Sequence, residues 1–182
     1  MLKPEENPPI TWPEGKSISD FTGVWWVAHT KSRNEKALAQ DLISSDINYF
    51  LPMSWRVRHQ RGRKIRSLLP LFSGYLFFCG EENQRISLLK TNRVANLIEV
   101  KDQGKLVDEL LQIAQALAAG ADLRPHQYIS AGKRCRVTAG PLSGLEGIVI
   151  RSKNGDYLVL QVDILGQATS VEIETDIIEI MD

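Results

Sequence analysis

The stretch from Arg136 to Val149 constrains the fold more than any other part of the sequence. It reads RVTAGPLSGLEGIV, with short apolar runs on either side of a segment rich in glycine and proline. Proline presets φ for a turn, and glycine accepts the positive φ values that other residues resist. The stretch therefore predicts a strand, a tight turn on Gly140-Pro141, and a second strand that begins at Gly147.

Further strand and turn signals follow in the same region. Asn154-Gly155 is a strong short-range signal for a hairpin, and residues 157–162 are expected to form the next strand. A turn near Leu165-Gly166 and two more short strands complete the pattern. About five short strands in so short a segment can close into a small barrel, so residues 131–182 are predicted to form an all-β domain.

The first part of the chain predicts a different architecture. Residues 1–22 are rich in Pro, Glu, Asn and Ser, which is typical of a flexible extension. A strand is expected at residues 25–30 and a helix near 33–45, because Ser32 and Glu35 have the spacing of a capping box. An apolar stripe at helical spacing supports that helix; it consists of Leu38, Ala39, Leu42 and Ile43.

The pattern continues with an extended stretch that begins at Tyr49, breaks at Gly62 and returns through residues 71–78. A short helix near 82–90, a strand at 95–100 and an amphipathic helix near 105–119 follow. This order predicts an α+β domain over residues 23–120, an antiparallel sheet with flanking helices. The polar segment 121–130 is interpreted as a linker between the two domains.

Composition narrows the possible environments and partners of the chain. Its 182 residues carry no net charge, but residues 1–130 hold 17 Lys/Arg against 14 Asp/Glu, a net of +3, while residues 131–182 have a net of −3. The acidic balance of the second part favours a protein partner over nucleic acid. We expect a cytoplasmic protein with no membrane partner, because there is no apolar h-region or spanning run and Cys79 and Cys135 are isolated.

The most charged segment is residues 56–66, which contain six basic residues, one histidine and no acidic residue. Such a cluster can displace counterions from a phosphate backbone. The alternative is an ordinary solvated hairpin tip. The six candidate nucleic-acid-binding residues are Arg56, Arg58, Arg61, Arg63, Lys64 and Arg66.

A dense aromatic group occupies residues 72–78. Strand alternation places Tyr75 and Phe77 on one face and Leu76 and Phe78 on the other. Core packing is the expectation for Leu76 and Phe78.

Catalysis is not expected from the sequence. There is no phosphate-binding glycine loop, and the three histidines have no cysteine or carboxylate at metal-ligand spacing. We therefore predict no catalytic residues, no metal site and no cofactor.

Both halves of the chain resemble the NusG family of transcription elongation factors. Residues 132–149 resemble its KOW motif, and residues 162–169 resemble the rest of its carboxy-terminal domain. Trp25-Trp26-Val27, the capped helix and residues 71–76 resemble its amino-terminal NGN domain, although Ser73 stands where members usually have proline. The resemblance implies an NGN domain followed by a small SH3-like KOW barrel.

The resemblance also implies partners for particular residues. Phe72 and Tyr75 would line the patch that binds RNA polymerase, with Trp25 beside it. The basic hairpin would contact the non-template strand or upstream duplex DNA. A ribosomal protein or a termination factor would bind the loop of Ile164, Leu165 and Gly166, where Leu165 replaces the usual phenylalanine.

The implied function is the modulation of pausing, termination or antitermination. The amino-terminal extension, Ser73 and a loosely similar segment at 88–94 favour a specialised, operon-specific paralog of the RfaH kind. The housekeeping factor is the first alternative. A ribosome-associated RNA-binding protein that uses its KOW barrel is the second.

Overall fold

The computed structural model describes residues 6–181 and has an α+β fold. The chain divides into two compact units, Met1–Gln103 and Gly104–Asp182. The expected boundaries, a first domain ending at 120 and a linker over 121–130, differ from this division. The difference arises because the last predicted helix and the linker segment bond to strands of the second unit, as described below.

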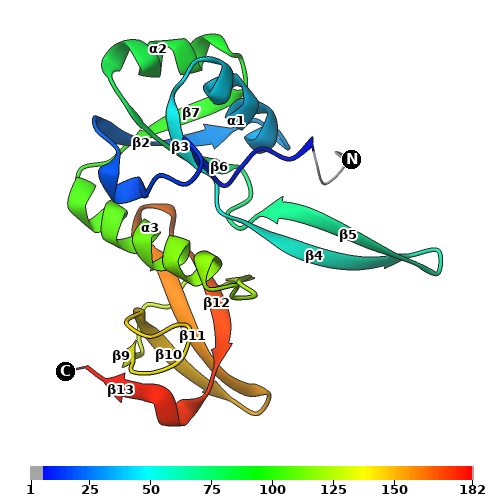
Figure 1. Ribbon diagram of the computed structural model, residues 1–182, viewed down its shortest axis with the longest axis vertical. Coiled ribbons are helices and arrows are strands. Elements are labelled where there is room, and N and C mark those ends of the chain that lie inside the picture. The colour runs from blue at the N-terminus through cyan, green and yellow to red at the C-terminus, as the bar shows by residue number, and fades with distance from the viewer. Residues whose placement is uncertain (1–5, 182) are drawn as a thin grey trace. The chain divides into compact units, whose positions relative to one another are not determined.

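The first unit is built on a five-stranded antiparallel sheet with the strand order β1-β3-β6-β2-β7. Its strands are β1 (Thr11–Trp12), β2 (Val24–Thr30), β3 (Asn48–Phe50), β6 (Tyr75–Gly80) and β7 (Val94–Glu99). Helices α1 (Glu35–Ser44) and α2 (Glu82–Lys90) follow β2 and β6 in the chain, and a short 3-10 turn, η2 (Ile18–Asp20), precedes β2. Figure 1 labels strands β2, β3, β6 and β7 and helices α1 and α2 of this unit.

The core of this unit follows from the strand and helix periodicities. Leu76 and Phe78, two residues apart on β6, share one face of the sheet and are fully buried. They pack in one apolar cluster with Leu38 and Leu42, which lie one turn apart on α1. The prediction that Leu76 and Phe78 are core residues is confirmed.

The amino-terminal segment is ordered over residues 6–22, contrary to the flexible extension predicted for 1–22. Strand β1 pairs with β3 and so adds an edge to the sheet. The hydroxyl of Tyr49 donates a hydrogen bond to the carbonyl of Pro9 at 2.7 Å, and the amide of Leu51 donates to the carbonyl of Ile10 at 2.7 Å. Pairing with β3 and hydrogen bonds from Tyr49 and Leu51 thus hold this polar segment at the edge of the sheet. Residues 1–5 lie outside the described part of the chain.

The start of α1 also differs from the expected capping box of Ser32 and Glu35. The helix begins at Glu35, and Asn34 is the residue before its first turn. The Glu35 carboxylate instead accepts a hydrogen bond from the amide of Gly74. A reciprocal cap is present at α2, where the amide of Glu81 donates to the side chain of Gln84 at 2.8 Å.

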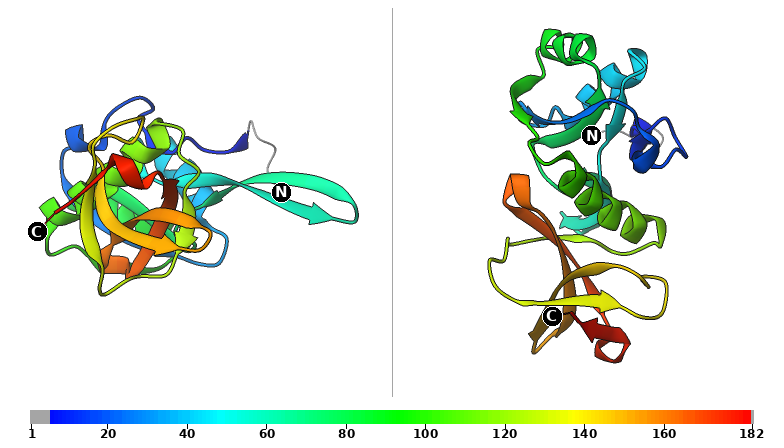
Figure 2. Two further views of the ribbon diagram at one scale, coloured as in Figure 1. Left: turned by 90° about the horizontal axis from the view of Figure 1, so that it is seen from below. Right: turned by 90° about the vertical axis from the view of Figure 1, so that its left-hand side faces the viewer.

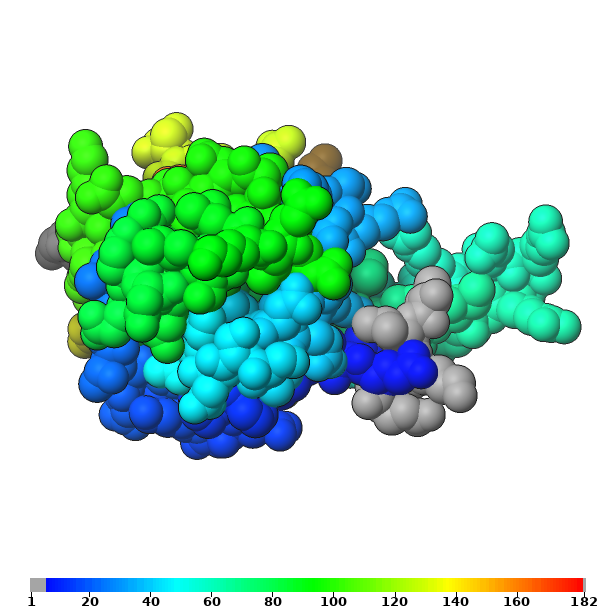
Figure 3. All heavy atoms as spheres, turned by 90° about the horizontal axis from the view of Figure 1, so that it is seen from above, coloured from blue at the N-terminus to red at the C-terminus, as the bar shows by residue number. Residues whose placement is uncertain are grey.

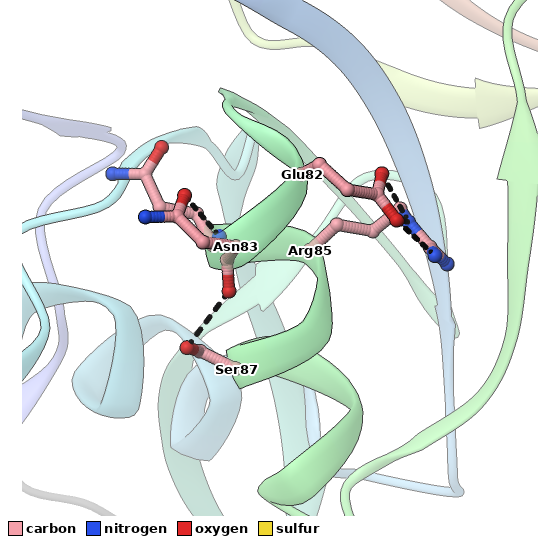
Figure 4. Close-up of polar contacts among 5 residues, drawn as sticks. Glu82, Asn83, Arg85 and Ser87 are labelled. Carbon is pink, nitrogen blue, oxygen red and sulfur yellow. Dashed lines mark hydrogen bonds and ion pairs between the residues drawn. The ribbon is translucent and has the colours of Figure 1, made fainter.

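The surface of α2 carries two local polar contacts. The hydroxyl of Ser87 donates to the carbonyl of Asn83 at 3.0 Å. Arg85 is folded against Glu82 in a bidentate ion pair, one turn of helix apart (Figure 4). The ion pair holds the Arg85 guanidinium against Glu82.

The second unit combines α3 (Gln103–Ala118) with a six-stranded antiparallel sheet of order β13-β9-β10-β11-β12-β8. Its strands are β8 (Arg124–His126), β9 (Lys133–Val137), β10 (Glu146–Ser152), β11 (Gly155–Val162), β12 (Gln167–Ile173) and β13 (Ile178–Ile180). Two 3-10 turns, η3 (Asp163–Leu165) and η4 (Thr175–Ile177), connect strands. Strand β8 lies inside the segment expected to be a linker and pairs with β12.

Side chains of α3 bond to the strand connections of this unit. The amide of Glu146 donates to the side chain of Gln112 at 2.9 Å, and the side chain of Gln115 donates to the carbonyl of Ser143 at 3.0 Å. The amide of Asp163 donates to Glu109 at 3.2 Å. These three contacts recur along one side of the helix and join it to the sheet.

The connection between β9 and β10 has the glycine conformation expected for a turn. Gly140 has a φ of +80°, in the left-handed region. At Gly147 an added Cβ would meet the carbonyl oxygen of Val159 at 2.5 Å, so this position needs glycine because β10 and β11 approach closely. The hairpin predicted at Asn154-Gly155 is present, but Ser152 pairs with Gly155, so the two loop residues are Lys153 and Asn154.

Candidate functional site

The basic segment forms a two-stranded hairpin, β4 (Met53–Gln60) and β5 (Arg63–Pro70), which is a sheet of its own. Gln60 pairs with Arg63, and the two residues between them, Arg61 and Gly62, have φ values of +49° and +74°. Two central residues with positive φ define a type I′ turn, whose twist matches that of the flanking strands. The hairpin projects from the first unit as a long arm (Figures 1 and 2).

Basic side chains lie on both faces of this arm. Residues paired across the strands share a face, so Lys64 and Arg66 lie on the face of Val57, while Arg58 and Arg63 lie on the other. All four basic side chains are exposed, as is Arg61 at the tip, and Arg56 is half-buried. The space-filling view shows the arm extending beyond its neighbours in the first unit (Figure 3). Both faces of the arm therefore carry exposed positive charge.

The base of the arm is attached to the first unit by hydrogen bonds and by buried residues. The ammonium of Lys36, on α1, donates to the carbonyl of Leu68 on β5 at 2.5 Å and to the side chain of Asn7 at 2.5 Å. Burial lowers the pKa of Lys36. Met53 and Ser54, at the start of β4, are buried. The arm thus has a fixed root and an exposed, basic end.

A second surface is centred on Tyr75. Tyr75 at the start of β6 pairs with His29 on β2, and their rings stack with centroids 5.0 Å apart and planes 19° from parallel. His29 is exposed and Tyr75 is half-buried. The pair presents an aromatic surface with polar ring atoms, as is common at protein interfaces.

Three hydrogen bonds, two within the backbone and one to a side chain, fix the turn that precedes Tyr75. The amide of Tyr75 donates to the carbonyl of Phe72 at 3.1 Å, and Gly74, the third residue of the turn, has a φ of +86°, as in a type II turn. The amide of Gly74 donates to Glu35 at 2.6 Å, and its carbonyl accepts from the amide of Thr30 at 2.8 Å. The turn is therefore held by Glu35 and Thr30 as well as by the conformation of Gly74, and it needs no proline at Ser73.

Two of the predicted interface residues are buried in this structure. Phe72 is 1% exposed and lies edge-on to Phe77, with ring centroids 6.2 Å apart. Trp25 is 4% exposed and stacks on Phe21 at 5.7 Å. Both side chains belong to the interior, because Phe77 covers the ring of Phe72 and Phe21 covers that of Trp25, and Tyr75 alone of the three is at the surface.

The loop predicted to bind a protein partner is the 3-10 turn η3, closed by Gly166 in the left-handed conformation. Ile164 and Leu165 are half-buried. Asp163 anchors the loop: its carboxylate accepts hydrogen bonds from Lys105 on α3 and from the hydroxyl of Tyr128, the latter at 2.9 Å. The hydrogen bond from Lys105 lowers the pKa of Asp163, and the hydrogen bond to Asp163 raises the pKa of Tyr128.

Two other features were considered in the described residues: a metal site and a membrane-spanning helix. Within residues 6–181, no three His, Cys, Asp or Glu side chains gather as a metal site would require. None of the helices in this same range is long and apolar enough to cross a membrane.

Sequence reasoning missed two residues of these surfaces, His29 and Trp55. His29 is separated from Tyr75 by 46 positions in the chain, and only the pairing of β2 with β6 brings the rings together. Trp55 precedes the basic run by one residue, and its ring lies 4.4 Å from the guanidinium carbon of Arg66. The signal that could have found Trp55 is its position in alternation with Val57, on the face of Arg66.

A helix-covered antiparallel sheet with a basic arm and an exposed aromatic pair has the features of a binding domain. Comparison with models of known protein families identifies the family of this domain. Residues 23–113, half of the chain, match the family model described as transcription termination factor nusG, and the chain belongs to the NusG family. No significant match to a curated protein is found. NusG-family members are transcription elongation factors that bind RNA polymerase and are not enzymes.

The family match covers two of the three candidate surfaces. Residues 23–113 include the Tyr75–His29 pair and the whole arm. The η3 loop lies outside the matched range, so its assignment rests on the resemblance of residues 131–182 to the KOW domain alone.

Proposed function

We propose that this protein is a specialised elongation factor of the RfaH kind, which binds RNA polymerase and changes pausing, termination or antitermination at particular operons. The observation that carries the proposal is the family match over residues 23–113, which contains both an exposed aromatic pair and a projecting basic arm. We further propose that it acts in the cytoplasm, where transcribing polymerase is available.

In this proposal the polymerase binds the surface of Tyr75 and His29. Large aromatic side chains held by a rigid support dominate binding energies at protein interfaces. The support here is the turn at Gly74, which bonds to Glu35 and Thr30. The polymerase would therefore meet a preformed surface and lose little conformational entropy in ordering it.

The arm would contact DNA beside the polymerase, either the non-template strand or the upstream duplex. Its exposed basic side chains would displace counterions from the phosphates, so the contact would weaken as salt rises. The contact would be independent of sequence, because phosphate contacts position a protein but carry no sequence information.

The second unit would be a KOW domain that recruits a ribosomal protein or a termination factor through Ile164 and Leu165. The support is the sequence resemblance, the antiparallel sheet, and the net charge of −3 on residues 131–182. The same negative charge disfavours the ribosomal RNA-binding alternative, since phosphate binding draws on Lys and Arg.

A specialised role is supported by two departures from the general pattern. Ser73 stands in place of the usual proline, and an amino-terminal segment adds strand β1 to the sheet edge. Either could set a partner preference that the general factor lacks.

A single-round transcription assay on a template with a pause site and a terminator tests the proposal. Purified full-length protein should change the lifetime of the pause or the fraction of terminated transcripts. Tyr75→Ala should abolish the change, while Ile86→Ala, at an exposed position on α2, should leave it intact. No effect of the wild-type protein on pausing or termination, across several templates, would contradict the proposed function.

A further inference from the structure

Trp55 occupies an unusual position on the basic arm. Its side chain is 38% exposed, and the guanidinium carbon of Arg66 lies 4.4 Å from the centroid of its ring. Val57, two residues along the same strand, is 48% exposed. Trp55 and Val57 together therefore form a small exposed apolar surface next to the basic residues of the arm.

The strand register shows what surrounds the tryptophan. Trp55 pairs with Leu68, Val57 with Arg66, and His59 with Lys64, and paired residues share a face. One face of the arm therefore has Trp55 and Val57 at its root side and His59, Lys64 and Arg66 along its length. Residues 56–66 contain no carboxylate, so nothing within the arm neutralises this face.

The first unit contains a second arginine–tryptophan pair, Arg85 and Trp26, that differs from Arg66 and Trp55 in its ion pairing. Arg85 lies 5.4 Å from the centroid of Trp26, but its guanidinium is held by Glu82 in a bidentate ion pair (Figure 4). Arg66 makes no ion pair with any carboxylate in the described part of the chain. Its charge and its planar surface thus remain available to a ligand while it rests on the Trp55 ring.

We propose that Trp55 and Arg66 form a stacking platform for an unpaired base of single-stranded DNA. Aromatic rings and guanidinium planes both stack on bases, and single-strand-binding proteins combine such platforms with a basic groove. Lys64 and Arg61, farther along the arm, would hold the adjacent phosphates. The proposal rests on the proposed function and deepens it: of the two DNA contacts left open there, the arm takes the unpaired non-template strand.

The platform also predicts that the arm distinguishes single-stranded DNA from duplex DNA. In a duplex the faces of the bases are covered by their neighbours, so a stacking platform gains nothing from duplex DNA. The phosphate contacts, in contrast, are available in both forms. Substitution of Trp55 should therefore affect single strands selectively, whereas charge reversal elsewhere on the arm should affect both.

Fluorescence anisotropy with the full-length protein tests this. The probes are a labelled oligothymidine of about 12 nucleotides, the duplex of the same length, and an abasic strand of that length. Trp55→Ala should weaken binding of oligothymidine by at least about five-fold and leave the duplex within about two-fold. The abasic strand should bind the wild type no better than oligothymidine binds Trp55→Ala.

Two conservative variants keep the test independent of folding. Arg66→Lys retains the charge but not the planar stack, so it should weaken oligothymidine binding while the dependence of affinity on salt stays unchanged. Arg85→Lys, the matched control at the other arginine–tryptophan pair, should have no effect. Trp55→Phe should retain most of the affinity but abolish the quenching of tryptophan fluorescence that oligothymidine causes in the wild type.

The outcomes separate this inference from the proposed function. Equal losses of affinity for single strand and duplex, or no loss with Trp55→Ala, would overturn the platform while leaving a basic DNA-binding arm. Tighter binding of oligouridine than of oligothymidine would overturn the assignment to DNA. A Trp55→Ala protein that binds oligothymidine normally but polymerase weakly would show that the tryptophan contacts a protein. If charge reversal of the arm also leaves DNA binding unchanged, the DNA contact of the proposed function fails as well.

Discussion

The carboxylate of Glu35 shows how one residue can support a surface it does not form. Glu35 is 7% exposed and accepts a hydrogen bond from the amide of Gly74 at 2.6 Å, directly beneath the turn that carries Tyr75. Glu35→Ala would remove the acceptor of the half-buried Gly74 amide, so we expect a loss of about 1 kcal/mol in the free energy of unfolding. Glu35→Gln retains an acceptor oxygen and should lose less. Urea unfolding of the two variants measures the difference, and equal losses would contradict the hydrogen-bond account.

Phe72 and Tyr75 should respond differently to the same truncation. Phe72→Ala removes a 1%-exposed ring from against Phe77 and should lower the free energy of unfolding by about 3–5 kcal/mol. Tyr75→Ala removes a half-buried ring and should cost clearly less. Urea midpoints compared at constant slope test this. A Phe72→Ala protein as stable as the wild type would restore Phe72 as a candidate surface residue.

At the residue scale, strand alternation predicted which side chains of β6 share a face, but it could not predict which of the other aromatic side chains are buried. It placed Leu76 and Phe78 on one face of β6, and both are core residues. It could not exclude Phe72 and Trp25 from the interface, because burial depends on rings that arrive from elsewhere, namely Phe77 and Phe21. The stacking of His29 on Tyr75 is a property of strand pairing, which no local pattern encodes.

At the element scale, the β4–β5 arm is the feature whose charge can be tested as a unit. Reversal of Arg58, Arg61 and Arg63 to Glu should weaken DNA binding and flatten the slope of log affinity against log salt by about 0.7–0.9 for each phosphate that the arm no longer neutralises. These three are exposed and spare the Trp55–Arg66 pair. The same reversal at three exposed lysines outside the arm, Lys101, Lys133 and Lys153, is the control. An unchanged slope in the arm variant would make the arm an ordinary solvated surface.

The contribution of the Lys105–Asp163 contact between α3 and η3 to stability should depend on pH. The hydrogen bond from Lys105 lowers the pKa of Asp163, so this carboxylate stabilises the folded state above the pKa of an unfolded Asp, about 3.9. That stabilisation is lost as pH falls through the lower, folded pKa. The urea midpoint of the wild type should therefore fall more steeply below about pH 4 than that of Asp163→Asn. Lys105→Met should flatten the dependence in the same way, and parallel curves for all three proteins would contradict this account.

Most helices and strands could be predicted from the sequence, and the exceptions have a common cause. The helix at 82–90 and the strands of the second sheet follow from local periodicity and turn residues. Strand β1, strand β8 and the bonding of α3 to the second unit were missed. Each of these depends on a long-range partner: β3 for β1, β12 for β8, and the Glu146 and Asp163 amides for α3. A polar segment such as β1 or β8 is predicted to be a loop, because the sequence does not show the distant strand with which it pairs.

At the scale of the whole molecule, the family assignment can be joined to specific surfaces. The assignment rests on residues 23–113, and within that range the structure presents one exposed aromatic pair on a rigid turn and one basic arm on a fixed root. The central claim is that RNA polymerase binds the first of these surfaces. The arm and the η3 loop would then act on components near the polymerase.

Titration of full-length protein against purified RNA polymerase tests that claim most directly. We predict that the wild type binds, that Tyr75→Ala weakens binding by about 30-fold, as expected for loss of an interface anchor worth about 2 kcal/mol, and that His29→Ala weakens it less. Ile86→Ala on α2 should bind as the wild type does, and circular dichroism should show all variants folded. Failure of the folded wild type to bind polymerase, or wild-type affinity in a folded Tyr75→Ala protein, would contradict the account.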